Sequence, residues 1–474
     1  MRLRPKVAFL LTAILLPSAH AIAAGGQDDP IDRIARIERT LQPPAQIVGR
    51  EVTYALAERM AHHKVPGLSV SVFENGRIAW AKAWGVLEVG STRPVDTHTL
   101  FQAASIGKPL TATLAMKTAA RGLVGLDQPV NEVLREWKIP DNDFTRQRPV
   151  TLRQLLTHRA GILVGSFAGF EEGESLPSLE QILKGEPPAD TPPIVVDMLP
   201  GSSERYTDFG YAVVQQLLTE RLGAPFRESM RREVLDPAGM LDATFAQPLD
   251  AELRANAATG HTRSGETIAG RYRVFPDLAS SGLWATPSDI CRWSIALIDA
   301  WRGSSERLLS RAAARQLLGE GLISVQELDD GALRFQHVGS NPGFTSVFWA
   351  YTSGCGAAVM ANSSDMEIVN EVVRAIAVAY GWKELQPRTI AVVTLGDLGV
   401  YAGSYRIEDL VIRVRAEGDH LVAQNPREGT LTLYPESATD FVILEQGLPI
   451  KFEFDGGKVI RARNSRGLPL ERIE

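Results

Sequence analysis

Alternating apolar and polar positions mark two hairpins that lie far apart in the chain. Residues 68–73 alternate with period two, and residues 77–83 return as a partner strand after an Asn-Gly turn. Residues 344–351 and 355–361 repeat this arrangement around a second turn. The two hairpins predict an antiparallel sheet that is assembled from both ends of a long segment.

Helical periodicity appears next to both hairpins and between them. Val52, Leu56 and Met60 are four residues apart and predict one apolar helix face. Residues 365–382 read as an apolar helix, and residues 105–330 are helical and loop-rich. We therefore expect an α/β fold, with an antiparallel sheet flanked by helices, an inserted helical lobe, and a cleft between lobe and sheet.

Short apolar runs separated by turn residues fill the last part of the chain. Their length and spacing are typical of the strands of a small all-β barrel or sandwich. The six runs cover residues 410–415, 421–424, 431–434, 441–444, 450–454 and 459–463. We expect a first domain over residues 25–385, followed by a linker and a C-terminal β domain over residues 386–474.

The first 24 residues have the features of a secretory signal peptide. Arg2, Arg4 and Lys6 precede the apolar run 7–16, and small residues at 19–21 provide a cleavage site. The run is short for a bilayer span, and no later segment approaches the length of a transmembrane helix. We expect an exported protein, periplasmic or secreted, without a stable membrane span.

Composition and charge exclude several classes of partner. The chain has 474 residues, of which 44% are hydrophobic and 22% charged, and its formal net charge is -6. Nucleic acid is not an expected partner of so acidic a chain. Cys291 and Cys355 have no metal-ligand spacing and are expected to be two buried free thiols rather than a disulfide. We expect no metal and no cofactor.

A Ser-x-x-Lys tetrad is the strongest candidate for chemistry. Ser105 and Lys108 begin a predicted helix that stops near Gly122, so their side chains share one face. A Ser hydroxyl needs a neighbouring base to become a nucleophile, and a Lys can take part where an Arg stays protonated. A chain with 28 Ser and 10 Lys would contain about 0.6 such tetrads by chance, so the tetrad alone proves nothing. A helix-capping Ser beside a solvent-exposed Lys is the alternative.

Four further segments accompany the tetrad in a fixed order. They are residues 150–162 (VTLRQLLTHRAGI), 206–211 (YTDFGY), 280–289 (SSGLWATPSD) and 337–344 (HVGSNPGF). With residues 101–110 around the tetrad, they make the chain resemble the serine hydrolases of the class C β-lactamase and penicillin-binding-protein family. That family also includes DD-peptidases, D-amino-acid peptidases and esterases. The resemblance covers roughly residues 45–385.

The resemblance implies a role for each matching residue. Ser105 looks like the nucleophile that accepts the acyl group, and Lys108 looks like its partner. Tyr206 looks like the general base and later proton donor. The backbone N–H of Ser340, together with that of Ser105, would form an oxyanion hole, which is usually a large catalytic contribution.

Two positions depart from the family pattern on the substrate-binding side. Asp208 stands where the family commonly has Asn, and its carboxylate would raise the pKa of Lys108 by favouring the charged form. His337 and Gly339 resemble the family's third motif, but β-lactamases favour Lys at the first position. Because a neutral imidazole attracts a substrate carboxylate less than an ammonium does, we expect weak or no β-lactamase activity.

The remaining histidines and one acid are interpreted as structural. His158 follows a helix opened by the capping pair at 151–154 and is expected to face the C-terminal helix dipole. His62 and His63 lie at a predicted helix end and are expected on the surface. Asp289 reads as a helix-start residue.

The C-terminal β unit shows a second, shorter resemblance. It opens with residues 401–405 (YAGSY), contains residues 433–437 (LYPES), and resembles the lipocalin-like domains appended to some members of the family. A barrel can bind an apolar ligand or cover one edge of a catalytic domain. We expect a structural or substrate-gating role.

The sequence therefore predicts a metal-independent serine hydrolase that works through a Ser105 acyl-enzyme. Esters and D-amino-acid amides or short peptides are the expected substrates. One alternative is a penicillin-recognising sensor or binding protein that is acylated with little turnover, and another is a purely structural surface protein. The oligomeric state is left open.

Overall fold

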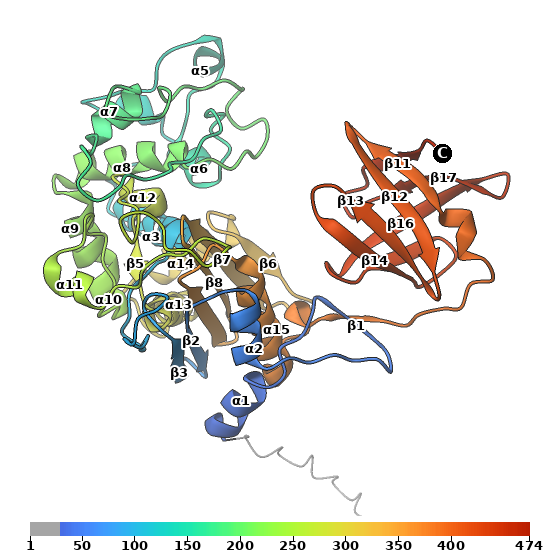
Figure 1. Cartoon of the computed structure of the whole chain (residues 1–474). Helices are drawn as coiled ribbons and strands as arrows, with labels where there is room; N and C mark the ends of the chain where they lie inside the picture. The colour runs from blue at the N-terminus through green and yellow to red at the C-terminus, as the bar shows by residue number, and fades with distance from the viewer. Residues whose placement is uncertain (1–28) are drawn as a thin grey trace, which may run out of the picture.

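The computed structural model describes residues 29–474. A six-stranded sheet lies at the centre of the larger part of the molecule (Figure 1), and every neighbouring pair of its strands is antiparallel. In spatial order the strands are β3 (Arg77–Gly85), β2 (Gly67–Glu74), β9 (Cys355–Ala361), β8 (Phe344–Tyr351), β7 (Leu333–Asn341) and β6 (Val325–Glu327). Both predicted hairpins are present, and they pair through β2 and β9.

Three helices from the two ends of this part cover one face of the sheet. They are α1 (Pro30–Ile37), α2 (Leu56–His62) and α15 (Met366–Tyr380). Leu56 and Met60 of α2 are buried against this face, but Val52 precedes the helix and is 42% exposed. The predicted helix face was therefore wrong at its first residue.

His63 corrects a second expectation at the end of α2. His62 is exposed as expected, but His63 is largely buried between α2 and α15. Its Nε2 lies 3.2 Å from Oε1 of Glu371, and its Nδ1 lies 3.4 Å from Oδ1 of Asp365. Arg59 completes the cluster through a bidentate contact with Glu371. The surface prediction failed because neither carboxylate is near in sequence.

Three further helices lie on the other face of the sheet, and the first of them follows the candidate nucleophile Ser105 in the chain. They are α3 (Gly107–Ala120), α13 (Pro287–Arg302) and α14 (Arg311–Gly319). Asp289 belongs to the capping box that opens α13, as predicted. Cys291 of α13 is buried and donates to the Ser71 carbonyl of β2 at 3.4 Å. Cys291 and Cys355 are free thiols, but Cys355 is only partly buried.

The segment between β3 and β6 supplies an additional helical lobe. Its short and long helices are α4 (Val130–Val133), α5 (Asp143–Gln147), α6 (Leu152–Leu156), α7 (Leu179–Lys184), α8 (Phe209–Leu222), α9 (Phe226–Met230), the π-helix η2 (Arg231–Leu235), α10 (Asp236–Ala238), α11 (Ala251–Ala255) and α12 (Leu278–Ser281). The lobe lies beyond α3, on the side of the sheet away from α15 (Figure 1). The expected α/β architecture with a helical lobe is present.

The C-terminal unit is a closed barrel in which every strand pairs antiparallel with both neighbours. Its strands are β11 (Gly403–Ile407), β12 (Leu410–Glu417), β13 (His420–Asn425), β14 (Gly429–Pro435), β15 (Asp440–Ile443), β16 (Leu448–Asp455), β17 (Lys458–Arg463) and β18 (Pro469–Arg472). The six predicted runs correspond to β12 through β17. The flanking strands β11 and β18 pair with each other and close the barrel.

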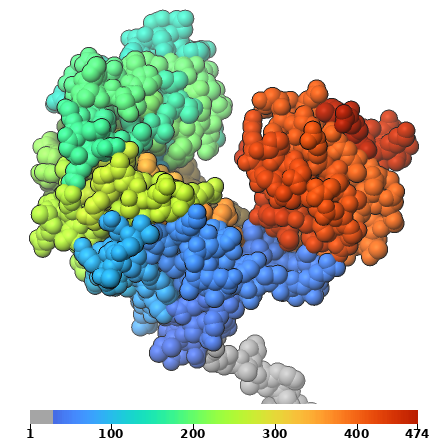
Figure 2. All heavy atoms as spheres, viewed as in Figure 1, coloured from blue at the N-terminus to red at the C-terminus, as the bar shows by residue number. Residues whose placement is uncertain are grey.

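Short paired strands join the barrel to the rest of the molecule. These are β1 (Ala45–Ile47) and β10 (Arg388–Ile390), which pair in parallel; the other short pair, β4 (Phe101–Gln102) with β5 (Trp284–Ala285), lies next to Ser105 instead. An apolar cluster of β1, β10 and barrel residues and two ion pairs, Arg50 with Asp419 and Arg388 with Glu436, hold the barrel at this junction. Figure 2 shows the barrel as a lobe of its own, reached through this segment. The turns η3 (Lys383–Leu385) and η4 (Leu398–Tyr401) flank β10.

Two further expectations concern the predicted leader and membrane-spanning helices. The predicted leader over residues 1–24 lies outside the described residues. Within residues 29–474, no helix has the length and apolar character that a membrane crossing requires.

Candidate active site

Ser105 lies in a tight turn that leads directly into a helix. The turn is the 3-10 segment η1 (Ala104–Ile106), and α3 follows at Gly107. Ala104 has φ +50°, a left-handed conformation that is costly for a residue with a side chain. Ala104 is itself fully buried, so its surroundings hold this conformation. The strained backbone presents the neighbouring Ser105 hydroxyl at the surface of the cleft.

Lys108 is buried directly behind Ser105, with 1% of its side chain exposed. Its Nζ donates to Ser105 Oγ at 2.8 Å and to the Ser280 carbonyl at 3.2 Å, and it lies 2.7 Å from Oδ1 of Asp208. The first two contacts are hydrogen bonds, and the third is an ion pair that brings a carboxylate next to the ammonium group. Burial lowers the pKa of Lys108, but Asp208 and Tyr206 together outweigh it, so the pKa is raised above its ordinary value.

Tyr206 reaches the nucleophile from the opposite side. Its phenol donates to Ser105 Oγ at 3.0 Å, and the residue is 48% exposed and lines the cleft. Lys108 Nζ lies 5.1 Å from the centre of the same ring. The Ser105 hydroxyl oxygen therefore contacts both Lys108 and Tyr206, which is the geometry that proton transfer to and from this oxygen requires.

His158 lies in the site, beside Tyr206, which the sequence interpretation did not predict. Its ring lies 4.3 Å from the ring of Tyr206, and its Nδ1 accepts the Thr207 N–H at 3.3 Å. Burial and the positive charge of Lys108 lower the pKa of His158 to about 3. The ring is therefore neutral and cannot act as the charged partner of a helix dipole, so that expectation was wrong. The sequence did offer a sign of this position, because His158 belongs to the matching segment 150–162.

Strand β7 forms the opposite wall of the cleft. A side chain at Gly339 would collide with the Ala103 carbonyl and the Ser346 hydroxyl. The Ser346 hydroxyl donates to that carbonyl at 3.0 Å. Glycine thus lets β7 approach the nucleophile turn closely. Burial and the charge of Lys108 lower the pKa of His337 to about 4, which leaves its imidazole neutral. Ser340 lines the cleft on the same strand.

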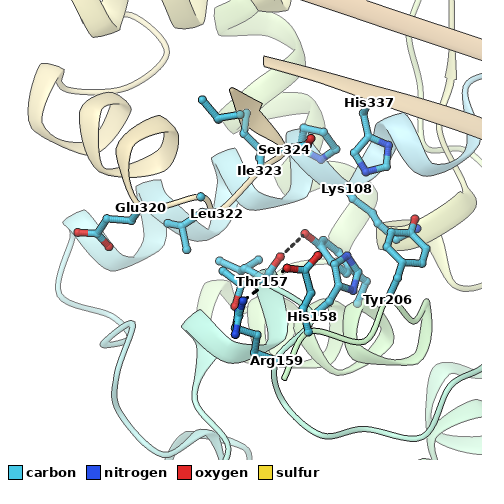
Figure 3. Close-up of a pocket in the computed structure, with 16 residues that line it drawn as sticks. Lys108, Thr157, His158, Arg159, Tyr206, Glu320, Leu322, Ile323, Ser324 and His337 are labelled. Atoms are coloured by element: carbon cyan, nitrogen blue, oxygen red, sulfur yellow. Dashed lines mark hydrogen bonds and ion pairs between the residues drawn. The ribbon is translucent and has the colours of Figure 1, made fainter. Parts of the chain in front are cut away.

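Two adjoining cavities open on either side of this constellation. One, of about 480 Å³, is lined by Ser105, Asp208 and Ser340 among others, and the second has a volume of about 550 Å³. Tyr206, Ser324 and His337 line both. Figure 3 shows Tyr206, His158 and His337 on one side of the second cavity, with Glu320 and Leu322 across from them. A substrate can therefore place groups on both sides of Ser105.

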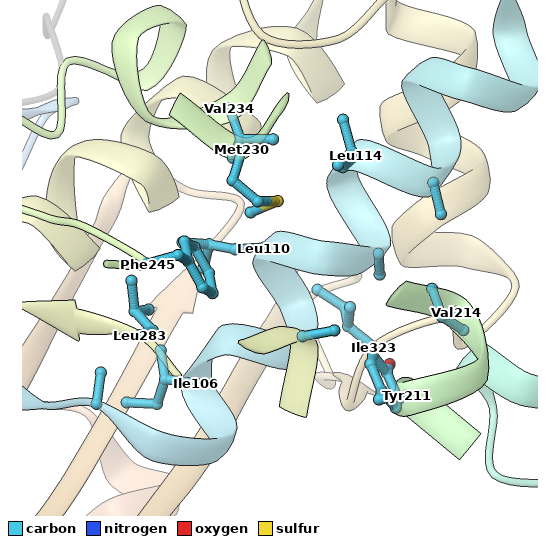
Figure 4. Close-up of a cluster of buried hydrophobic side chains, with 14 of the residues drawn as sticks. Ile106, Leu110, Leu114, Tyr211, Val214, Met230, Val234, Phe245, Leu283 and Ile323 are labelled. Carbon is cyan, nitrogen blue, oxygen red and sulfur yellow. The ribbon is translucent and has the colours of Figure 1, made fainter. Parts of the chain in front are cut away.

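The nucleophile helix rests on an apolar cluster. Ile106, Leu110 and Leu114 project from η1 and α3 into residues of the helical lobe, including Met230 and Phe245 (Figure 4). All five side chains are at most 2% exposed. Tight packing of this kind fixes the orientation of α3 and hence of Ser105 and Lys108.

Comparison with known proteins agrees with the fold and the motifs. Residues 52–380 match the β-lactamase family, so the chain belongs to that family. Penicillin-binding protein 4 of Amycolatopsis lactamdurans is 30% identical over 264 residues, which cover 54% of this chain and 66% of the relative. A β-lactamase of Pseudomonas fluorescens is 27% identical over 237 residues, 49% of this chain and 60% of its own length. The chain thus spans somewhat less than two thirds of these two relatives.

An esterase and a solved structure extend the comparison. Esterase EstB of Burkholderia gladioli is 26% identical over 299 residues, 56% of this chain and 73% of the esterase. The octameric penicillin-binding protein homologue of Pyrococcus abyssi has a TM-score of 0.60 at 21% identity, covering 88% of this chain and 98% of that structure. That likeness concerns the fold. It confirms the predicted fold class, and the family match makes the chain a β-lactamase-family protein related to penicillin-binding proteins and esterases.

Proposed function

We propose that the protein is an exported serine hydrolase that works through an acyl-enzyme on Ser105. The observation that carries this proposal is the pair of contacts on Ser105 Oγ, 2.8 Å from Lys108 Nζ and 3.0 Å from the Tyr206 hydroxyl. A serine with two proton-managing groups at this distance, open to a cleft, is equipped for nucleophilic attack on a carbonyl carbon. The predicted leader supports export.

Tyr206 rather than Lys108 is the proposed base. Lys108 donates two hydrogen bonds, forms an ion pair with Asp208 and has a raised pKa, so it stays an ammonium and stabilises negative charge. In the reacting form Tyr206 is a phenolate, stabilised by the neighbouring Lys108 ammonium. Ser105 Oγ bonds to the substrate carbonyl carbon while its proton passes to the Tyr206 phenolate oxygen. The tetrahedral intermediate then expels the leaving group, which takes that proton from Tyr206. Water then attacks the carbonyl carbon of the Ser105 ester in the same way, and the carboxylic acid product leaves Ser105.

The proposed oxyanion hole and binding residues complete this assignment. The backbone N–H groups of Ser105 and Ser340 would stabilise the negatively charged oxygen, and Asp208, His337 and Gly339 would line the substrate site. All five residues lie at or beside the cleft described above. The barrel is proposed to have a structural or substrate-gating role.

Esters and D-amino-acid amides or short peptides are the proposed substrates. The neutral His337 places no positive charge where β-lactamases favour Lys, so a β-lactam carboxylate gains little there. Asp208 likewise offers only acceptor oxygens where an amide would also donate. We therefore expect esters and amides to be hydrolysed faster than β-lactams. The names of the relatives span penicillin-binding proteins, a β-lactamase and an esterase.

A panel of substrates with time-resolved product release tests this proposal. Short-chain p-nitrophenyl esters and D-alanyl amides should show continuous, metal-independent turnover, and a chromogenic cephalosporin should be a poor substrate. A stoichiometric burst without turnover would favour the second candidate, a penicillin-recognising sensor. The observation that supports this candidate is Asp208 beside Lys108, because a carboxylate there would slow deacylation. Absence of any product from all three would contradict the hydrolase.

A further inference from the structure

A buried carboxyl lies behind the lysine and has no part in the steps above. Asp277 precedes α12 and is 1% exposed. It occupies the N-cap position of that helix, yet its side chain accepts no backbone N–H there. Its Oδ1 has no hydrogen-bond partner within residues 29–474. Because a buried carboxyl without full hydrogen bonding is costly, ordinary helix capping does not explain it.

Ser280 links this carboxyl to the lysine. Its hydroxyl donates to Asp277 Oδ2 at 2.5 Å, while its backbone carbonyl accepts from Lys108 Nζ at 3.2 Å. One residue therefore binds Asp277 through its side chain and Lys108 through its main chain. Asp277 and Lys108 are therefore connected through the short turn that carries Ser280.

The neighbouring residue holds the same short turn between two helices. The Ala279 carbonyl accepts from Thr111 of α3 at 3.0 Å, and the Ala279 N–H donates to Gln215 of α8 at 3.0 Å. These bonds fix the middle of α12, and Ser280 itself is held by Asp277, whose backbone carbonyl accepts from the Ser280 N–H and hydroxyl, each at 3.3 Å. The Asp277 carboxyl supplies the short contact to the Ser280 hydroxyl.

Charge connects Asp277 to the same site. Asp208, at the start of α8, faces it, and Lys108 of α3 reaches it through Ser280. Burial is the main reason that the pKa of Asp277 is raised to about 7; Asp208 raises it further, and bonds from Ser280 and Ser281 oppose the rise. Asp277 and Asp208 are therefore neighbouring carboxyl groups, of which Asp208 contacts the ammonium directly and Asp277 ionises only near neutral pH.

We propose that Asp277 is a positioning residue for the reaction at Ser105, which holds the Ser280 carbonyl on Lys108 and, with Asp208, keeps Lys108 in its charged form. This rests on the proposed function, since it concerns the lysine that serves Ser105. Asp277 lines neither cavity beside Ser105 and touches no reacting atom. Its loss should therefore change the rate of acylation and the pH profile rather than the affinity for substrate.

The test follows the rate at which a fluorophosphonate labels Ser105 across pH, with KM and kcat for one p-nitrophenyl ester as a second readout. Asp277→Asn keeps the shape but removes the charge, so the basic limb of the profile should move to lower pH by about one unit. Asp277→Ala should lower kcat about 10-fold with KM unchanged, because it also releases Ser280. Ser280→Ala keeps the carboxyl but breaks the contact, and it should lower kcat as well.

Asp289 provides a matched control. It is also fully buried, accepts from the hydroxyl of Thr286 at 2.9 Å and begins a helix, but it belongs to the capping box of α13 and contacts neither Lys108 nor Ser280. Asp289→Asn should leave the profile of folded protein in place. The inference is overturned if Asp277→Asn reproduces the wild-type profile, if Ser280→Ala keeps the wild-type kcat, or if Asp289→Asn shifts the profile equally. Absence of Ser105 labelling in the wild type would instead contradict the proposed function.

Discussion

Two buried ionic clusters lie on opposite faces of the central sheet and shift the pKa of histidine in opposite directions. Near α15, desolvation opposes protonation of His63, but Asp365 and Glu371 outweigh it and raise the His63 pKa to about 9. In the cleft, burial and the Lys108 ammonium lower the pKa of His158 to about 3 and that of His337 to about 4. The neighbouring charge, rather than burial alone, decides the direction.

The clusters also differ in what they leave open. Glu371 is bound by Arg59 and His63 and lines none of the cavities described above, so its hydrogen bonds serve folding. Lys108 and Tyr206 converge on Ser105 Oγ at the wall of a cavity of about 480 Å³. Buried charge is therefore evidence of chemistry only where it converges on a group that a substrate can reach.

The largest expected effect separates two tyrosines of the cleft. Tyr206→Phe removes the proposed proton carrier and should lower kcat/KM by about 10²-fold to 10⁴-fold, as expected for a positioned acid or base. Tyr211→Phe is the matched control, since that buried phenol donates only to the Leu156 carbonyl at 3.2 Å. It should cost about 1 kcal/mol of stability with activity retained. An unchanged rate in Tyr206→Phe would remove Tyr206 from its role.

The closed cluster should respond in the opposite manner. Glu371→Ala leaves Arg59 and His63 without their shared carboxylate and should lower the free energy of unfolding by about 3 kcal/mol. Denaturant titration measures this loss, and kcat/KM per folded molecule should stay near the wild-type value. A loss of activity in fully folded protein would contradict the separation of the two clusters.

The pH dependence of stability gives a smaller effect with a definite sign. The folded pKa of His63 is raised to about 9 from an ordinary value of 6.5, so its contribution is fully present below about pH 6.5 and is lost as the pH rises through 9. It should amount to about 2 kcal/mol. His63→Gln should remove this part of the unfolding profile. A wild-type stability that rises over the same interval relative to the variant would contradict the assignment.

The smallest effect concerns the charge beside the lysine. Asp208→Asn removes the carboxylate that lies 2.7 Å from Lys108, so the pKa of Lys108 should fall. We expect the basic limb of kcat/KM to move to lower pH by about one unit or more, and amide-bearing substrates such as β-lactams to gain relative to simple esters. Profiles for one ester and one β-lactam measure both. If neither moves, Asp208 does not control the charge of Lys108.

Local pattern explains what could be predicted from the sequence. Period-two alternation located β2, β3, β8 and β9, and the Ser-x-x-Lys spacing placed Ser105 and Lys108 on one turn, because both patterns depend on near neighbours. Tyr206 was found through motif order. The three side chains do meet in the structure.

What was missed depends on contacts between distant segments. The hydrogen bond from Lys108 to the Ser280 carbonyl joins segments far apart in the sequence and cannot be predicted from local pattern. The carboxylates that pair with His63 likewise come from the far end of the domain. Strands β11 and β18 are defined by the pairing of Tyr405 with Arg472, which closes the barrel. Such pairings are set by tertiary structure, which local propensity does not encode.

Covalent labelling at one serine tests the central claim most directly. The wild type, Ser105→Ala and Ser324→Ala are treated with a fluorophosphonate and weighed as intact proteins; Ser324 lines the same cavity as Ser105 and is the matched serine. We predict one adduct on the wild type and on Ser324→Ala, mapped to Ser105, and none on Ser105→Ala. An adduct that persists in Ser105→Ala, or a wild type that takes up no label, would contradict the acyl-enzyme mechanism.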